Sequence, residues 1–160
     1  MDAYLRSLLD RLGDADPIAV LQATPVRLAE LTEGLAPDDW RRAAADGGWS
    51  PAETVAHLAD VELGMGFRLR QAVAGVAQAQ AFDQDAWARR YRRLDPSLAL
   101  EAHRALRSWN LALLATFDLD DWLAELDHPE RGRETVDLVV RSLAAHDLRH
   151  LDAVEARLRG

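Results

Sequence analysis

Three histidines are the residues of this chain best suited to metal chemistry. His146 and His150 lie four residues apart in His-Asp-Leu-Arg-His, and His57 ends the segment Ser-Pro-Ala-Glu-Thr-Val-Ala-His. Helical positions i and i+4 project from one face, so the pair can chelate a single ion. Such a pair also arises by chance. The alternative is three structural histidines that hydrogen-bond to backbone and carboxylate groups.

The lack of cysteine restricts the kinds of metal site that the chain can form. The sequence contains none, which excludes thiolate zinc sites, iron–sulfur clusters and cysteine nucleophiles. Any ion must then be held by His, Asp, Glu or water. Three imidazoles suit a borderline divalent ion such as Zn²⁺ or Ni²⁺ and leave coordination positions open, which is typical of catalytic sites.

Two carboxylates near His57 could support a metal ligand. Ligating histidines usually donate their other ring N–H to an acceptor. Glu53 precedes His57 by four residues and Asp60 follows it by three, so both occupy neighbouring helical positions. The competing interpretation is that Glu53 completes a capping box with Ser50 and that Asp60 is a solvated helix acid.

The other polar candidates are predicted to be structural. His103 and His128 have no partner at ligand spacing. Asp147 lies about 100° around the helix from His146, so we expect it to pair with an arginine. Trp49 is expected to pack against the bundle. No phosphate-binding glycine loop or nucleophile elbow is present.

Helix-start signals divide the chain into long and short helical segments. Asp16-Pro17, Ser50-Pro51 and Asp95-Pro96 each place a capping side chain before a proline at the first helical position. Thr24-Pro25 predicts a break, because proline lacks the amide that an interior turn uses. A short amphipathic helix is expected over 2–12, and longer helices over 17–34 with the break, 51–74, 96–117 and 134–158. Short helical stretches are expected after Asp83 and over 120–126.

Apolar periodicity gives the fold class. The helix from 51 carries Val55, Leu58, Val61 or Glu62, Met65 and Leu69 on its expected buried stripe. The helix from 96 carries Leu98, Ala102, Ala105, Leu106, Trp109, Leu113 and Leu114. No two-residue alternation or hairpin turn predicts strands. We therefore expect an all-α protein, a four-helix bundle with short accessory helices, as one domain over residues 1–160.

Charge and hydropathy exclude several partners. The formal net charge is −8, and the basic runs Arg89-Arg90 and Arg92-Arg93 are short, so nucleic acid is not an expected partner. No apolar stretch approaches the roughly 18 residues of a membrane span. The first residues do not resemble a signal peptide, so we expect a cytoplasmic protein. The expected partner is a small-molecule substrate.

Several motifs together resemble the DinB-like superfamily of metal-binding four-helix bundles. They are Gly48-Trp49-Ser50-Pro51 leading to His57-Leu58, and His146-Asp147-Leu148-Arg149-His150-Leu151, with further matches at 16–28 and 83–87. The resemblance covers nearly all of the chain. It implies that His57, His146 and His150 ligate a divalent metal, usually zinc or nickel, in a bundle that commonly forms a homodimer.

The resemblance also implies an activity. Relatives include bacillithiol transferases and mycothiol-dependent maleylpyruvate isomerase, in which the metal activates a thiol. We therefore expect a transferase that uses a low-molecular-weight thiol as cosubstrate on an electrophilic small molecule. We expect the thiol's carboxylates to be bound by one or more of four arginines: Arg68, Arg89, Arg90 and Arg149.

Two other functions fit the same motifs. One is a metal-dependent hydrolase that uses metal-bound hydroxide, with Glu53 or Asp60 as the proton acceptor. The other is a non-catalytic metal-binding domain with a role in stress response. A hydrolase requires a carboxylate close to the metal, whereas a thiol transferase requires a basic pocket.

Overall fold

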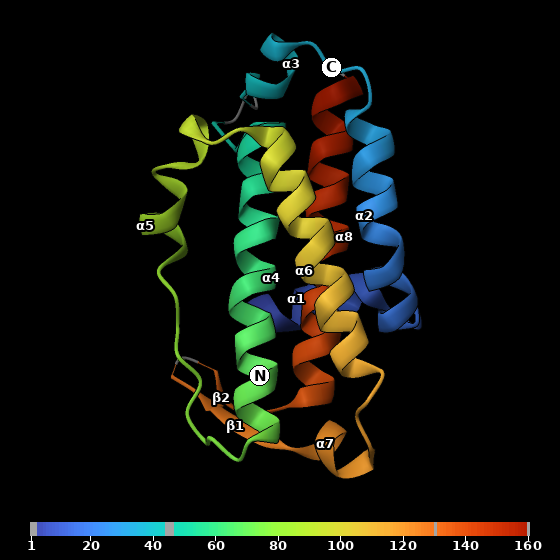
Figure 1. Cartoon of the computed structure of the whole chain (residues 1–160), viewed down its shortest axis with the longest axis vertical. Coiled ribbons are helices and arrows are strands. Elements are labelled where there is room, and N and C mark those ends of the chain that lie inside the picture. Colours follow the sequence, from blue (N-terminus) through green and yellow to red (C-terminus); the bar gives the residue numbers. More distant parts are fainter. Residues whose placement is uncertain (1–2, 44–46, 130, 160) are drawn as a thin grey trace.

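Four long helices lie side by side along the molecule in the computed structural model, which describes residues 3–43, 47–129 and 131–159 (Figure 1). They are α2 (Pro17–Thr32), α4 (Pro51–Val73), α6 (Pro96–Leu114) and α8 (Val136–Arg159). Helices α4 and α2 each pack against both α6 and α8. This closed arrangement confirms the predicted all-α four-helix bundle.

The path of the chain through the bundle requires a long crossover. Figure 1 shows α2 and α8 running in one direction and α4 and α6 in the other. Because α4 and α6 are parallel neighbours, residues 74–95 must return along the whole bundle. That crossover contains α5 (Gln84–Ala88) and the 3-10 helix η1 (Tyr91–Arg93). It passes beside α4, the helix that carries His57.

Short elements cover the ends and one side of the bundle. Helix α1 (Ala3–Leu12) packs on α8, α3 (Pro37–Arg41) packs on α4, and α7 (Leu119–Leu123) lies at the end opposite α3 (Figure 1). The predicted first residue of α1, Asp2, lies outside the described residues. None of the described helices combines the length and apolarity of a membrane span.

Capping residues set the starts of three long helices as the sequence predicts. Asp16 accepts a hydrogen bond from the Ile18 amide at the start of α2, and Asp95 does the same for Ser97 at the start of α6. At α4, Ser50 and Glu53 form a reciprocal capping box. These bonds satisfy amides that have no partner within the helix. At α4 they fix the residue at which the helix begins, and so the helical position of His57.

Helix α2 passes through Pro25 without ending, so the predicted break is wrong. Proline cannot donate a hydrogen bond to the carbonyl four residues earlier, which belongs to Leu21. Arg107 of α6 donates to that Leu21 oxygen through Nη1 at 2.8 Å. A side chain of the neighbouring helix thus replaces the missing backbone donor.

The buried face of α6 also differs from the prediction. Leu98 and Trp109, expected in the core, are 64% and 67% exposed. The buried positions follow the same helical period one residue later: Ala99, His103, Arg107, Asn110 and Leu114. The prediction holds at the end of the helix, where Leu114 is buried and Leu113 packs against the core. It is wrong at Leu98 and Trp109, because α6 turns polar side chains inward where partners on other helices can pair with them.

A two-stranded hairpin replaces the loop expected before α8. Strands β1 (Glu125–His128) and β2 (Gly132–Thr135) are antiparallel, with Leu126 opposite Glu134. The crossover extends this pairing, since the Asp127 amide donates to the Ala77 carbonyl at 2.6 Å. The strands are too short and polar for the alternation that sequence patterns detect. They join the crossover to the end of the bundle where α8 begins.

Candidate metal centre

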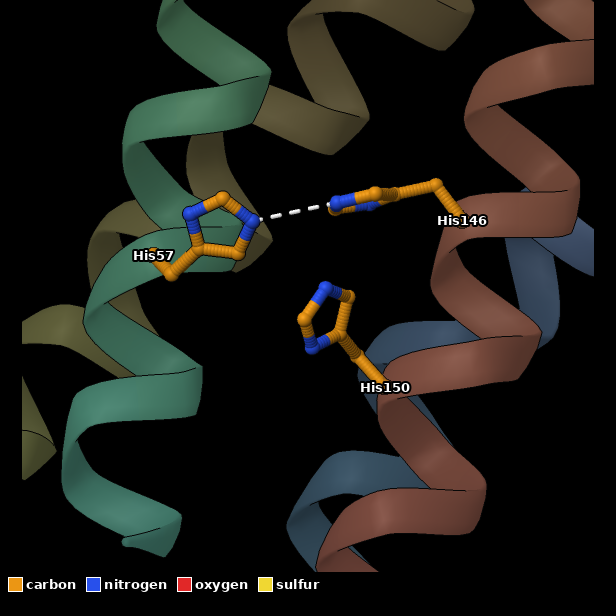
Figure 2. A group of neighbouring side chains, drawn as sticks. All are labelled: His57, His146 and His150. Atoms are coloured by element: carbon orange, nitrogen blue, oxygen red, sulfur yellow. Dashed lines mark hydrogen bonds between the residues drawn. The ribbon is translucent and has the colours of Figure 1, made fainter. Parts of the chain in front are cut away.

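His57, His146 and His150 converge in the bundle interior from two antiparallel helices (Figure 2). His57 comes from α4, and the other two come from successive turns of α8. The Nε2 atoms of His57 and His146 are 3.0 Å apart. One ring nitrogen from each residue lies within 4.8 Å of the others. The structure therefore brings together the three histidines that the sequence singled out.

These distances suit ligands of one ion. Two nitrogens that each lie about 2.0–2.1 Å from an ion, at angles between a right angle and the tetrahedral angle, are about 2.9–3.4 Å apart. The separation of His57 and His146 falls in this interval. His150 lies close to both, with ring centroids 4.9 Å from His57 and 4.4 Å from His146. Small side-chain rotations would bring all three nitrogens to a common ion.

The environment of the triad keeps its imidazoles neutral. Removal from water lowers the pKa of His57 to about 4 and that of His150 to about 3. Burial, assisted by the nearby His150, places the pKa of His146 well below its usual value. Arg149 adds to the lowering for all three residues. Neutral imidazoles carry the free lone pairs that a metal ion requires.

Two ring nitrogens of the triad lack hydrogen-bond partners. The Nδ1 atoms of His57 and His146 are buried and make no hydrogen bond among the described residues. Buried polar atoms are usually paired. The alternative in which these histidines are held by backbone and carboxylate partners is thus not what the described residues show. The close Nε2 contact and the third imidazole beside it fit a group of ligands. The two Nδ1 atoms, for their part, lack among the described residues the acceptor that ligating histidines usually have.

Trp49 lies against the triad. Its ring is nearly parallel to that of His150, at a centroid distance of 6.1 Å, and is tilted at 4.6 Å from His57. It also meets Tyr91 of the crossover edge-on. The capping box that starts α4 immediately follows Trp49, so the same local structure positions both the tryptophan and His57. Trp49 therefore both packs in the bundle and covers the site.

Of the two carboxylates considered near His57, Glu53 is engaged elsewhere. Glu53 accepts hydrogen bonds from the Ser50 amide and hydroxyl, and its other oxygen accepts one from Arg92 Nε at 2.8 Å. Burial raises the pKa of Asp60, and the nearby Tyr91 side chain partly offsets the rise, although the Tyr91 hydroxyl makes no hydrogen bond among the described residues. Neither carboxylate belongs to the group of candidate ligands among the described residues.

A second buried polar cluster lies beside the triad and was missed by sequence reasoning. Arg107 donates from Nη2 to Glu62 Oε1 at 2.7 Å, and its Nη1 lies 2.7 Å from Asp147 Oδ2. Asn110 donates to Glu62 as well. Together with the bond to the Leu21 carbonyl, this network joins α2, α4, α6 and α8. It confirms that Asp147 pairs with an arginine, and Glu62 among apolar neighbours was the available signal.

A cavity of about 270 Å³ adjoins the centre on the side of His146. His146 lies in its wall, and so do Arg68 of α4 and Arg131 of the hairpin turn. His128, expected to be structural, also lines the cavity from the end of β1. The sequence did not predict this cavity, because its wall combines α1, α4, α8, the crossover and the hairpin.

The described residues thus form a helical bundle with three convergent histidines and an adjoining cavity. A family model of the DinB superfamily matches residues 20–154, and the chain belongs to that superfamily. This confirms the resemblance seen in the motifs around the three histidines. No curated protein matches the chain at a significant level.

Two solved structures share the fold. One is YfiT from Bacillus subtilis, described as a probable metal-dependent hydrolase with an unusual four-helix bundle topology. It is 23% identical to this chain and has a TM-score of 0.84. The match covers 89% of this chain and 84% of that one. The other is a mycothiol-dependent maleylpyruvate isomerase, 12% identical with a TM-score of 0.65; the match covers 82% of this chain and 58% of that one. At these identities the likeness shows the fold alone.

Proposed function

We propose that this protein is a metal-dependent enzyme that transfers a low-molecular-weight thiol, of the bacillithiol or mycothiol type, to an electrophilic small molecule. His57, His146 and His150 would hold one divalent ion, Zn²⁺ or Ni²⁺. The observation that carries the proposal is the convergence of three imidazoles that burial keeps neutral, with no carboxylate among them in the described part of the chain. Such a ligand set leaves the ion's full positive charge for an anionic sulfur ligand.

The chain's own residues would prepare the thiol for attack. A divalent ion in an open site lowers the pKa of a thiol bound to it and so supplies a thiolate at neutral pH. Trp49 shields the site on one side. The cavity beside His146 offers space for the electrophile. The sulfur would form a bond to the electrophilic carbon, the thiol proton would pass to solvent, and a leaving group would depart with its electron pair.

A hydrolase is the second candidate, and the likeness to YfiT favours it. Hydrolysis needs a proton acceptor near the attacking water. Glu53 is held by Ser50 and Arg92, and neither Glu53 nor Asp60 belongs to the group of candidate ligands among the described residues. A hydrolytic route would require Glu53 to leave its present partners or Asp60 to approach the attacking water, which is why we place the thiol transferase first.

The proposal includes the setting in which the enzyme works. Low-molecular-weight thiols are kept reduced in the cytoplasm, so we place the protein there. We also propose a homodimer, supported by large apolar side chains exposed on α4 and α6: Leu63, Phe67, Leu98 and Trp109. Light scattering on wild type and Trp109→Glu tests the dimer, and a monomeric wild type at micromolar concentration would contradict it.

Elemental analysis and a thiol panel test the function. Wild type purified after supplementation with zinc or nickel is expected to hold one ion per chain, and His150→Ala is expected to lose it. Metal-loaded wild type should conjugate bacillithiol or mycothiol to a chromogenic electrophile, and the metal-free protein should not. Full metal retention by His150→Ala would reject the site, and equal rates with and without metal for every thiol would reject the transferase. Hydrolysis of a chromogenic ester or amide with no conjugation would support the second candidate.

A further inference from the structure

Arg68 is a buried cation in the wall of the cavity beside the metal centre. Its side chain comes from α4, is 4% exposed, and lines the same cavity as His146. The rest of the wall is largely apolar. Its apolar side chains come from α1, α4, the crossover and α8: Leu5, Leu8, Val61, Met65, Phe82 and Leu143.

The charge of Arg68 has no carboxylate partner within the described part of the chain. Its Nη1 contacts the Met65 sulfur at 3.5 Å, and its Nη2 donates to the Gln80 carbonyl at 3.4 Å. Its Nε is buried and makes no hydrogen bond. Long contacts to neutral acceptors do not compensate a buried guanidinium, which prefers a bidentate carboxylate or phosphate. The side chain thus retains donors for an anion.

Arg131, the other arginine in the cavity wall, has a carboxylate partner, and Arg68 differs from it in this respect. Arg131 forms two bonds to Glu134, from Nε at 2.6 Å and from Nη2 at 3.0 Å. Burial and the nearby Arg131 lower the pKa of Arg68, and the Glu134 carboxylate that Arg131 binds offsets part of this lowering without forming an ion pair with Arg68. An anion bound directly to Arg68 would add to that offset.

The other arginines considered for anion binding lie elsewhere. Arg89 and Arg90 are exposed beside the short helix α5. The guanidinium of Arg149 lies 5.5 Å from the centre of the Tyr4 ring. None of the three lines the cavity. Arg68 is therefore the residue of that set placed to hold an anion beside His146.

We propose that Arg68 binds the carboxylate of a small ligand whose apolar body fills the cavity and whose other end reaches the metal centre. Arg68 follows His57 by eleven residues on one helix, about 16 Å along its axis, so one carboxylate cannot contact both sites. The ligand must be elongated. The volume of about 270 Å³ lies near the lower end of ligand cavities, which favours a short amphipathic acid. The part played by the metal rests on the proposed function, whereas carboxylate binding by Arg68 does not.

Calorimetry on metal-free protein with octanoate and octanamide tests this proposal. The two probes have the same apolar body, and only the acid can pair with Arg68. Wild type is expected to bind octanoate at least tenfold more tightly than octanamide. Arg68→Met should remove that preference by weakening octanoate and leaving octanamide unchanged, and Arg68→Lys should retain part of it. Arg89→Met removes the same charge from an exposed position and should bind as wild type does.

Equal affinities of wild type for octanoate and octanamide would overturn the proposal, and so would equal losses in Arg68→Met and Arg89→Met. The wild-type comparison and Arg68→Lys decide the matter if Arg68→Met does not fold. Because EDTA-treated protein is used, failure of the metal-dependent activity leaves the result intact. Displacement of octanoate by bacillithiol would assign the carboxylate to the thiol cosubstrate, and displacement by crotonate alone would assign it to the electrophile. If neither displaces octanoate from wild type, the site does not serve this reaction and the link to the metal centre is rejected.

Discussion

The bundle holds two adjacent clusters of buried polar side chains that are composed in opposite ways. In the cluster around Arg107, a cation lies between two acids, Glu62 and Asp147. In the triad, three bases approach one another, and among the described residues no acid joins them and two of their ring nitrogens have no hydrogen-bond partner. The first cluster pairs opposite charges within the protein and ties helices together. The second places three imidazoles close enough to share an added cation, which distinguishes a candidate binding cluster from a structural one.

Removal of Arg107 should have the largest effect on this comparison. In Arg107→Met, Glu62 and Asp147 remain buried without a counter-charge, so we expect the free energy of unfolding of the metal-free protein to fall by about 3–5 kcal/mol. Urea denaturation measures it. Arg104→Met, an exposed position on the same helix, should change it by less than about 0.5 kcal/mol. A loss below about 1 kcal/mol in Arg107→Met would show that the acids do not depend on Arg107.

Metal should stabilise the protein through the triad alone. Zinc buffered at about 100 times its dissociation constant should raise the free energy of unfolding of wild type by about 2.7 kcal/mol. His57→Ala removes one ligand and should abolish the increase. His103→Gln, which changes a buried histidine outside the triad, should keep it. Thermal melts with and without zinc check both variants, and an undiminished zinc effect in His57→Ala would remove His57 from the site.

His103 should make the protein sensitive to acid. Burial, and then the charge of Arg107, lower the pKa of His103 to about 3, whereas the unfolded chain titrates near pH 6.5. Between these values the unfolded state binds the proton and the folded state does not. The contribution of neutral His103 to the free energy of unfolding is therefore fully present above pH 6.5. It falls by about 1.4 kcal/mol per pH unit as the pH drops toward 3.

The variant His103→Gln isolates this contribution. It cannot take up the proton, so its free energy of unfolding should fall less steeply by about 1.4 kcal/mol per pH unit between pH 6 and pH 4. Urea denaturation of the metal-free protein at several pH values measures the slopes. Parallel slopes for wild type and the variant would mean that His103 becomes protonated in the folded protein.

Pro25 and Arg107 should be coupled by a smaller energy. In Pro25→Ala the new amide can donate to the Leu21 carbonyl, which now depends on Arg107. Loss of Arg107 should then cost less in the Pro25→Ala background, by about 0.5–1.5 kcal/mol, the net value of one hydrogen bond. A double-mutant cycle in urea measures the difference. Strict additivity would show that Arg107 does not replace the missing backbone donor.

Local signals along the chain predicted the parts of the site that depend on one helix. The capping box of Ser50 and Glu53 set the start of α4, and the four-residue spacing of His146 and His150 placed both on one face of α8. Capping and helical periodicity act over a few residues, so the sequence carries them directly. The family motifs then joined His57 to the pair.

The errors occurred where distant residues compensate one another. Pro25 predicted a break, yet Arg107 supplies the missing donor. Leu98 and Trp109 were expected on the buried face of α6. Arg107 is buried there instead, because it pairs with Glu62 of α4 and Asp147 of α8. A residue's polarity predicts exposure only when it has no buried partner, and partners on other helices cannot be read from a local pattern.

The sequence by itself determined an all-α bundle with long helices, their main start points, and three histidines able to ligate an ion without cysteine. These features follow from local hydrogen bonding, helical spacing and the chemistry of the residues present. Only the tertiary structure decided that the three rings meet, that Glu53 binds Arg92, and that Arg68 lies buried in the wall of a cavity beside His146. The physical reason is that a binding site is set by the packing of separate helices, whose distances and shared cavities no single segment of the chain encodes.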